Sequence, residues 1–154
     1  MKGQTAVEYL MTYGWAILII LIVAGVLAYY GIFAPSGFLG PTARGFGQVQ
    51  VLTPWSLATT GTLTLNIENR VGGTINITYI NTTFTTGGSG TYTFTPSAPL
   101  QLTSGKQGIF QATNSEIGTH SSGDTWTATT TIYYQYPPGG SVFSSTGTLS
   151  GSYS

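Results

Sequence analysis

The side chains that could carry acid–base or metal chemistry are few in this sequence. From residue 44 onward the chain has one histidine and three acids, and cysteine is absent. His120 and Asp124 lie in the stretch GTHSSGD, which holds the residue types of a Ser-His-Asp triad, and together with Glu116 they could supply three metal ligands. However, no strand-to-helix turn presents a serine, and the Gly- and Ser-rich spacing matches no recognised metal loop. We therefore expect no catalytic residue, no metal and no cofactor, and hence no enzyme.

Charged residues are scarce along the whole chain. They make up 5% of its 154 residues, four basic and four acidic, against about 25% in ordinary globular proteins. We expect no nucleic acid as a partner, because affinity for nucleic acid depends on clustered Lys and Arg. Hydrophobic residues reach 41%, which argues against disorder, and the length suits one domain with an accessory segment.

That accessory segment is an apolar stretch near the N-terminus. Residues 15–33 contain no charge, and the only charges before Arg44 are Lys2 and Glu8. A helix over 4–33 would be roughly 45 Å long at 1.5 Å per residue, more than the ~30 Å of a bilayer core. Aromatic residues near both ends resemble the belts of membrane-spanning helices. Pro35 is expected to end the helix.

Small residues interrupt this apolar helix. Gly14 and Gly25 each cost about 1 kcal/mol in a water-exposed helix, so their presence calls for a reason. Ala24, Gly25 and Ala28 form a face on which a second helix backbone can approach closely. This pattern indicates helix–helix packing, although a lone membrane anchor with incidental small residues fits it equally.

Glu8 is an acid beside a long apolar helix, which is costly without a partner. Cleavage between Gly3 and Gln4 would remove Lys2 and create an α-ammonium at Gln4, with Glu8 as the fifth residue of the mature chain. In a bundle, the carboxylate of one copy could meet the ammonium of its neighbour and fix the stagger. The alternative is that Glu8 is simply an acid near the helix N-terminus, where the helix dipole favours a carboxylate.

The stretch KGQTAVEYLMTYGWAILIILIV resembles the class III signal peptide and assembly helix of archaeal type IV pilins. The resemblance rests on a short basic leader ending in Gly3, on Gln4, on Glu8 followed by Tyr9 and Leu10, and on the uninterrupted apolar helix, and it covers about the first 33 residues. It implies a leader at 1–3, removed by a prepilin peptidase. It further implies an assembly ATPase and a membrane platform protein that build a helical homopolymer at the cell surface from membrane-inserted precursors, for adhesion or cell–cell contact.

Three other functions stay open. An archaellum-type filament subunit would share the same leader. An ordinary secretory signal would have residues 15–27 as its apolar core and be cut after Ala28, although its leading stretch carries no net charge. A tethered or secreted module could bind glycans through the aromatics Trp55, Trp126, Tyr133, Tyr134 and Tyr136, but alternation places Trp126, Tyr134 and Tyr136 on one face, which favours a core.

The rest of the chain has the pattern of a β-domain. Residues 34–47 are rich in Gly and Pro and predict a linker, and alternating runs at 62–67, 74–79, 91–95 and 125–136 predict strands. The apolar positions Leu63, Leu65, Ile67, Ile75, Ile77 and Tyr79 are expected to face one core. Turns are expected at 71–73, 87–90, 104–106 and 137–140, the second of which lacks the Lys-Ser/Thr ending of a phosphate-binding loop.

The predicted fold class is therefore α+β: a long apolar helix followed by an all-β domain over 48–154. Seven or eight short strands favour a sandwich, immunoglobulin-like, or a small barrel. The weakly patterned end, 146–154, is expected to be an edge strand or a tail. Asn76 and Asn81 begin sequons, and alternation places Asn76 on the outer face, where a glycan could be attached.

Overall fold

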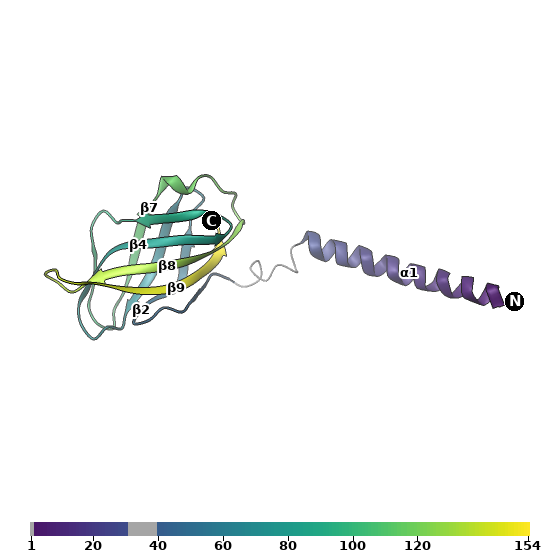
Figure 1. Ribbon diagram of the computed structural model, residues 1–154, viewed down its shortest axis with the longest axis horizontal. Coiled ribbons are helices and arrows are strands. Elements are labelled where there is room, and N and C mark those ends of the chain that lie inside the picture. Colours follow the sequence, from purple (N-terminus) through teal and green to yellow (C-terminus); the bar gives the residue numbers. More distant parts are fainter. Residues whose placement is uncertain (1, 31–39) are drawn as a thin grey trace. The chain divides into compact units, whose positions relative to one another are not determined.

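The structure, a computed structural model, describes residues 2–30 and 40–154 (Figure 1). The chain divides into two units between Phe38 and Leu39, a helix and a β-domain. Within these residues the one α-helix, α1, covers Lys2–Tyr29, and the backbone N–H of Tyr30 still donates to the carbonyl of Val26 at 3.0 Å. The last predicted helical positions, 31–33, and Pro35 lie outside the described residues.

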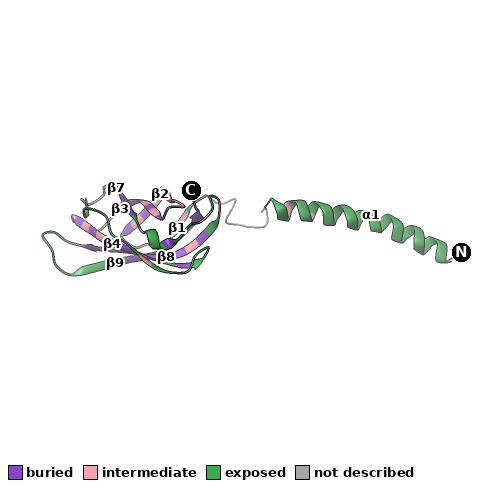
Figure 2. Cartoon of the chain, turned by 90° about the horizontal axis from the view of Figure 1, so that it is seen from above, coloured by how far each residue is buried: buried purple, intermediate pink, exposed green. Residues whose placement is uncertain are grey.

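The β-domain consists of two antiparallel sheets, which confirms the predicted α+β class (Figures 1 and 2). The large sheet has the order β1 (Thr42–Arg44), β9 (Val142–Ser152), β8 (Thr125–Gln135), β4 (Ile75–Thr86) and β5 (Gly90–Phe94), and β6 (Leu100–Leu102) also pairs with β4. The small sheet has the order β2 (Val49–Leu57), β3 (Thr62–Asn69) and β7 (Gln107–Thr113). One short 3₁₀ helix, η1 (Ser115–Ile117), follows β7.

The core lies between the two sheets because both present alternating apolar residues to each other. Leu63, Leu65 and Ile67 of β3 are fully buried, and so are Ile75 and Ile77 of β4. These five positions confirm the predicted core face. Burial of each such side chain stabilises the fold by roughly 1.5–3 kcal/mol relative to exposure.

Tyr79 is the exception, and the prediction that it faces the core is wrong. The pairing of β4 with β8 shifts register between Ile77 and Tyr79, so an extra residue interrupts the alternation. A bulge of this kind moves the following side chains to the opposite face. Ile80 takes the buried position instead, and the Tyr79 ring stacks on Tyr133 with centroids 4.5 Å apart.

Of the predicted linker, 34–47, residues 34–39 lie outside the described residues, and the prediction is wrong for 42–44. Thr42–Arg44 forms the edge strand β1, which pairs with Thr148–Ser150 of β9. The Gly and Pro residues around it favour a linker, so the sequence pattern did not indicate this short strand. The end of the chain is likewise neither an edge strand nor a tail, because β9 lies between β8 and β1 in the large sheet.

A buried asparagine joins the sheets at one end. Asn69, the last residue of β3, has no exposed surface. Its Nδ2 donates to the carbonyls of Gly73 at 2.7 Å and Leu102 at 2.9 Å, and its Oδ1 accepts from the N–H of Val71 at 2.8 Å. One side chain therefore closes the predicted 71–73 turn and ties it to β6.

Glycine is required at the predicted 87–90 turn. Gly87 has a φ of +70°, and a Cβ at this position would collide with the carbonyl oxygen of Thr125. The Gly87 carbonyl also accepts a hydrogen bond from the hydroxyl of Tyr153 at 3.0 Å. The glycine-rich run is therefore a tight turn, as predicted.

Candidate assembly helix and the surfaces of the β-domain

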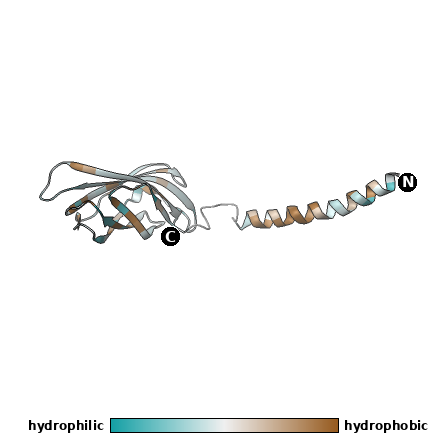
Figure 3. Cartoon of the chain, turned by 90° about the horizontal axis from the view of Figure 1, so that it is seen from below, coloured by the Kyte–Doolittle hydropathy of each residue, from teal (hydrophilic) through white to brown (hydrophobic). Residues whose placement is uncertain are grey.

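The apolar helix is the first candidate functional element. Gly3–Tyr29 is long and apolar enough to cross a membrane, judged by length and composition. Its large apolar side chains, from Val7 to Val26, are exposed along the helix (Figures 2 and 3). From Gly14 to Ala28 the helix is apolar on all sides, and such a helix is stable in lipid or packed among other elements, so this part of α1 calls for a partner or a membrane.

Glu8 lies exposed on the second turn of α1. Gln4 precedes it by four residues, so both side chains project from the same face of the helix. Thr12, one turn further on, donates its hydroxyl to the backbone carbonyl of Glu8 at 3.0 Å, a hydrogen bond that does not involve the carboxylate. Tyr9 and Tyr13 contact each other, with ring centroids 4.6 Å apart. An ammonium created at Gln4 would therefore lie one helical turn from this carboxylate.

Gly14 leaves a notch in the apolar surface. The hollow is lined by Met11, Trp15 and Leu18, the neighbours that surround position 14 on a helix, and has a volume of about 240 Å³. Apart from the neighbouring helix backbone, a Cβ at Gly14 or Gly25 would meet no atom within 4 Å, so side-chain packing within α1 does not require either glycine. Ala24 is half-buried, whereas Gly25 and Ala28 are exposed. The small residues are therefore available to a second helix.

Both sequon asparagines lie on β4, inside the large sheet. Asn76 and Asn81 are half-buried; Asn76 lies between the buried Ile75 and Ile77, and Asn81 between the buried Ile80 and Thr82. The Oδ1 of Asn81 accepts from the hydroxyl of Thr93 at 2.8 Å, whereas the Oδ1 of Asn76 is buried without a hydrogen-bond partner in the described structure. Glycan attachment at either residue stays a prediction.

The aromatic residues considered as a glycan surface lie mostly in the core. Trp55, Trp126 and Tyr134 are buried, and the two indole rings meet edge to face with centroids 5.3 Å apart. Tyr133 is half-buried on the outer face of the large sheet. Tyr136 is 40% exposed, although it belongs to the inward face as predicted. These five side chains therefore form no common surface.

His120 and its acidic neighbours are engaged in local structure. The His120 ring stacks on Tyr153 at 4.1 Å between centroids, and its Nε2 lies 3.2 Å from the carbonyl oxygen of Ile117. Asp124 accepts from the N–H of Ser121 at 3.1 Å. Within residues 2–30 and 40–154, no group of three or more His, Cys, Asp and Glu side chains could hold a metal ion.

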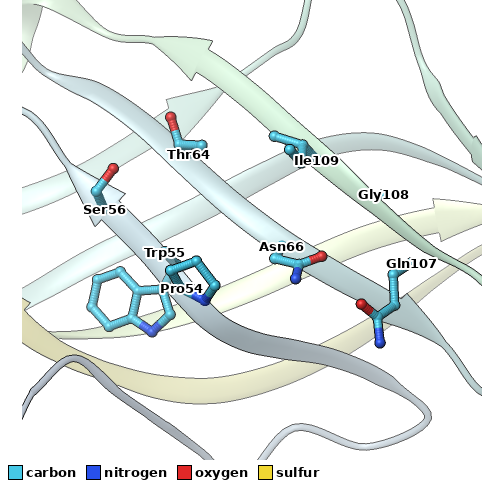
Figure 4. Close-up of a pocket in the computed structure, with 8 residues that line it drawn as sticks. All are labelled: Pro54, Trp55, Ser56, Thr64, Asn66, Gln107, Gly108 and Ile109. Atoms are coloured by element: carbon cyan, nitrogen blue, oxygen red, sulfur yellow. The ribbon is translucent and has the colours of Figure 1, made fainter.

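Sequence reasoning missed a groove on the outer face of the small sheet. A register shift between Leu52 and Ser56 marks a bulge in β2, which places Pro54 on one wall, while Ile109 of β7 forms the other (Figure 4). The short side chains Thr64 and Asn66 of β3 lie between them. The groove has a volume of about 370 Å³. Only the bulge, which alternation does not predict, could have indicated it.

Sequence reasoning also missed an aromatic ledge at the tip of the β8–β9 hairpin. Phe143 is 44% exposed and Val142 54% exposed, and the Phe143 ring contacts Tyr136 edge to face with centroids 5.5 Å apart. The hairpin continues past the end of the small sheet, where the carbonyl of Val49 accepts from the hydroxyl of Ser145 at 2.9 Å. Phe143 also stacks on Tyr134 with centroids 5.9 Å apart, and the Tyr136 ring lies against Gly73 in the turn after β3, so both side chains are only partly covered.

Comparison with known proteins adds no assignment. No family model matches the chain, and no curated protein matches it.

Proposed function

We propose that this chain is a structural subunit of an extracellular filament of the type IV pilus kind. The observation that carries the proposal is α1: an apolar helix whose large apolar side chains from Val7 to Val26 are exposed, with one acid, Glu8, as the fifth residue after the Gly3–Gln4 junction. In the filament, α1 packs among the helices of other copies and the β-domain lies outside. The filament serves adhesion to a surface or contact between cells.

The energetics of α1 agree with this role. A lipid bilayer is as apolar as a helix bundle, so moving α1 from lipid into a filament gains little from the hydrophobic effect. Close packing at Gly14 and around Gly25, together with pairing at Glu8, must then provide specificity. The free energy for extracting α1 from the membrane must then be supplied by other proteins, which agrees with the proposed assembly ATPase and membrane platform protein.

Pairing of Glu8 follows from its position. Before cleavage the carboxylate sits in the membrane-bound precursor; after removal of residues 1–3 by a prepilin peptidase, it meets the α-ammonium of a neighbouring Gln4. A partly buried ion pair fixes geometry more reliably than it adds stability, so its contribution is the axial stagger between subunits.

The test replaces Glu8 in the full chain in its native cells. Glu8→Ala should lower the yield of sheared filaments at least tenfold, while the amount of precursor in the membrane and the folding of the β-domain stay unchanged. Glu8→Asp, which keeps the charge, is the matched control and should retain most of the yield. Wild-type yield with Glu8→Ala would refute the role given to this carboxylate.

The glycan-binding alternative receives less support. Its strongest candidates, Trp55 and Trp126, have relative exposures of 5% and 1%, and a ligand would have to open the core to reach them. The filament proposal uses no such rearrangement.

A further inference from the structure

The bulge in β4 decides which side chains this strand presents to solvent. Unbroken alternation from Ile77 would turn both Tyr79 and Asn81 toward the core. The register shift between Ile77 and Tyr79 reverses the two faces. Ile80 is consequently fully buried, and Asn81 lies half-buried on the outer face of the large sheet. The fold therefore turns outward a sequon asparagine that strict alternation assigns to the core.

The amide of Asn81 is held with its nitrogen toward solvent. Its Oδ1 accepts a hydrogen bond from the hydroxyl of Thr93 at 2.8 Å. Its Nδ2 makes no hydrogen bond within the described residues, and it is not among the buried side-chain atoms that lack a partner there. This nitrogen, to which an N-linked sugar is attached, is therefore accessible. Attachment would also preserve the hydrogen bond from Thr93, because that bond uses only the oxygen.

Short side chains surround Asn81 on the outer face. Its direct cross-strand partners are Thr93 of β5 and Thr131 of β8, and Thr83 lies two residues further along β4 on the same face. Directly paired residues have Cβ atoms only about 4.5–5.5 Å apart, so the size of these neighbours decides how much space remains above the amide. Threonine at all three positions leaves room for a sugar ring.

The other sequon asparagine, Asn76, has different surroundings. Its direct cross-strand partners are the longer side chains of Gln101 and Gln135. Its Oδ1 is buried without a hydrogen-bond partner in the described structure. A sugar on Asn76 would therefore have to displace two glutamines, whereas one on Asn81 displaces none.

Tyr79 supplies an aromatic ring beside Asn81. The two residues lie on the same face of β4, about 7 Å apart along the strand. The Tyr79 ring is fixed by stacking on Tyr133, with centroids 4.5 Å apart. The C–H groups of a sugar carry partial positive charge and are attracted to the negative face of an aromatic ring. The bulge thus brings an acceptor asparagine and an aromatic ring to one face.

We propose that Asn81 carries an N-linked glycan whose first sugar packs against Tyr79, and that Asn76 stays unmodified. The donor is a lipid-linked glycan phosphate. The bond from its anomeric carbon to the phosphate oxygen breaks, a bond from that carbon to Nδ2 forms, Nδ2 loses one proton, and the lipid phosphate leaves. Because β4 pairs with strands on both of its sides, the transfer precedes the pairing of β4. This inference rests on the proposed function, which puts the β-domain outside the cell.

Mass spectrometry of the full chain from its native cells locates the modification. Trypsin leaves both sequons in one peptide, because it cleaves after Arg70 and Lys106, and chymotrypsin then separates them by cleaving after Tyr79. We expect added mass on the fragment that contains Asn81. The fragment that contains Asn76 should have the mass of its sequence.

A matched pair of substitutions tests the acceptor site. Thr83→Ala destroys the sequon of Asn81 and should abolish the added mass, whereas Thr83→Ser keeps the hydroxyl and should retain it. Filaments built from chains with unmodified Asn81 would overturn this inference alone, and so would added mass on Asn76. Absence of filaments from cells whose membrane-bound chain is modified at Asn81 would instead refute only the proposed function.

Thermal unfolding of the full chain in detergent tests the contact with the ring. Tyr79→Thr is introduced into the glycosylated protein and into the Asn81→Gln variant, which carries no sugar at this position. Groups in contact are energetically coupled, so the substitution should lower the Tm by at least about 2 °C more in the glycosylated protein. Equal decreases in the two backgrounds would overturn the packing of the sugar on Tyr79.

Discussion

Replacing Asn69 tests how the two sheets are joined. Asn69→Ala removes three hydrogen bonds, to Gly73, Val71 and Leu102, of 2.7–2.9 Å. Each is worth about 1 kcal/mol, and a buried partner left unsatisfied costs about 1–3 kcal/mol. The free energy of unfolding should therefore fall by at least about 3 kcal/mol. At roughly 4 °C per kcal/mol for a domain of this size, the Tm should fall by about 12 °C or more.

The assay is thermal unfolding of the full chain in detergent, followed by near-ultraviolet circular dichroism of the core aromatics. Asn66→Ala is the matched control: it removes the same side chain from the same strand, but from the half-buried outer face. It should change stability by no more than about 0.5 kcal/mol, as surface changes usually do. Equal effects of the two substitutions would refute the account of Asn69.

Two further predictions concern pH and helix packing. Burial, followed by the charges of Tyr92 and Asp124, raises the pKa of Tyr153 from 10.0 to about 12, so its contribution to stability is complete below pH 10 and is lost as the pH rises to 12. At about 1.4 kcal/mol per pKa unit, the free energy of unfolding of the wild type should fall by up to about 2 kcal/mol more than that of Tyr153→Phe over this pH range. Denaturant titrations at each pH measure both values. The same pH dependence of stability in the two proteins would contradict this prediction. Gly14→Leu should fill the notch beside Trp15 and lower the yield of filaments severalfold in a shearing assay, although leucine favours the helix itself. The control Ile20→Leu should leave the yield unchanged. Equal yields from the two variants would argue against close packing at Gly14.

The part of the fold that follows from local pattern was predictable. Alternation located the buried faces of β3 and of the start of β4, because a strand with one buried face must alternate. The absence of charge over 15–30 located α1, because no other element tolerates so long an apolar run.

The rest depends on contacts distant in sequence. The bulge before Tyr79 arises in pairing with β8, and β1 is a strand only because β9 lies beside it. Tyr136 has the inward orientation that alternation predicts, yet it is 40% exposed, since it lies just beyond the last residue of β8, Gln135. Relative strand length is a tertiary property, so neither the ledge nor the groove could be derived from the residues that form them.

The most direct test of the central claim is the N-terminal residue of this protein in filaments sheared from its native cell surface, determined by mass spectrometry. The account predicts a chain that begins at Gln4, with residues 1–3 removed and α1 retained. A chain that begins at Tyr29 would mean a secreted β-domain without its helix, and an intact Met1 would mean a plain membrane anchor; either result would contradict assembly through α1 after leader cleavage.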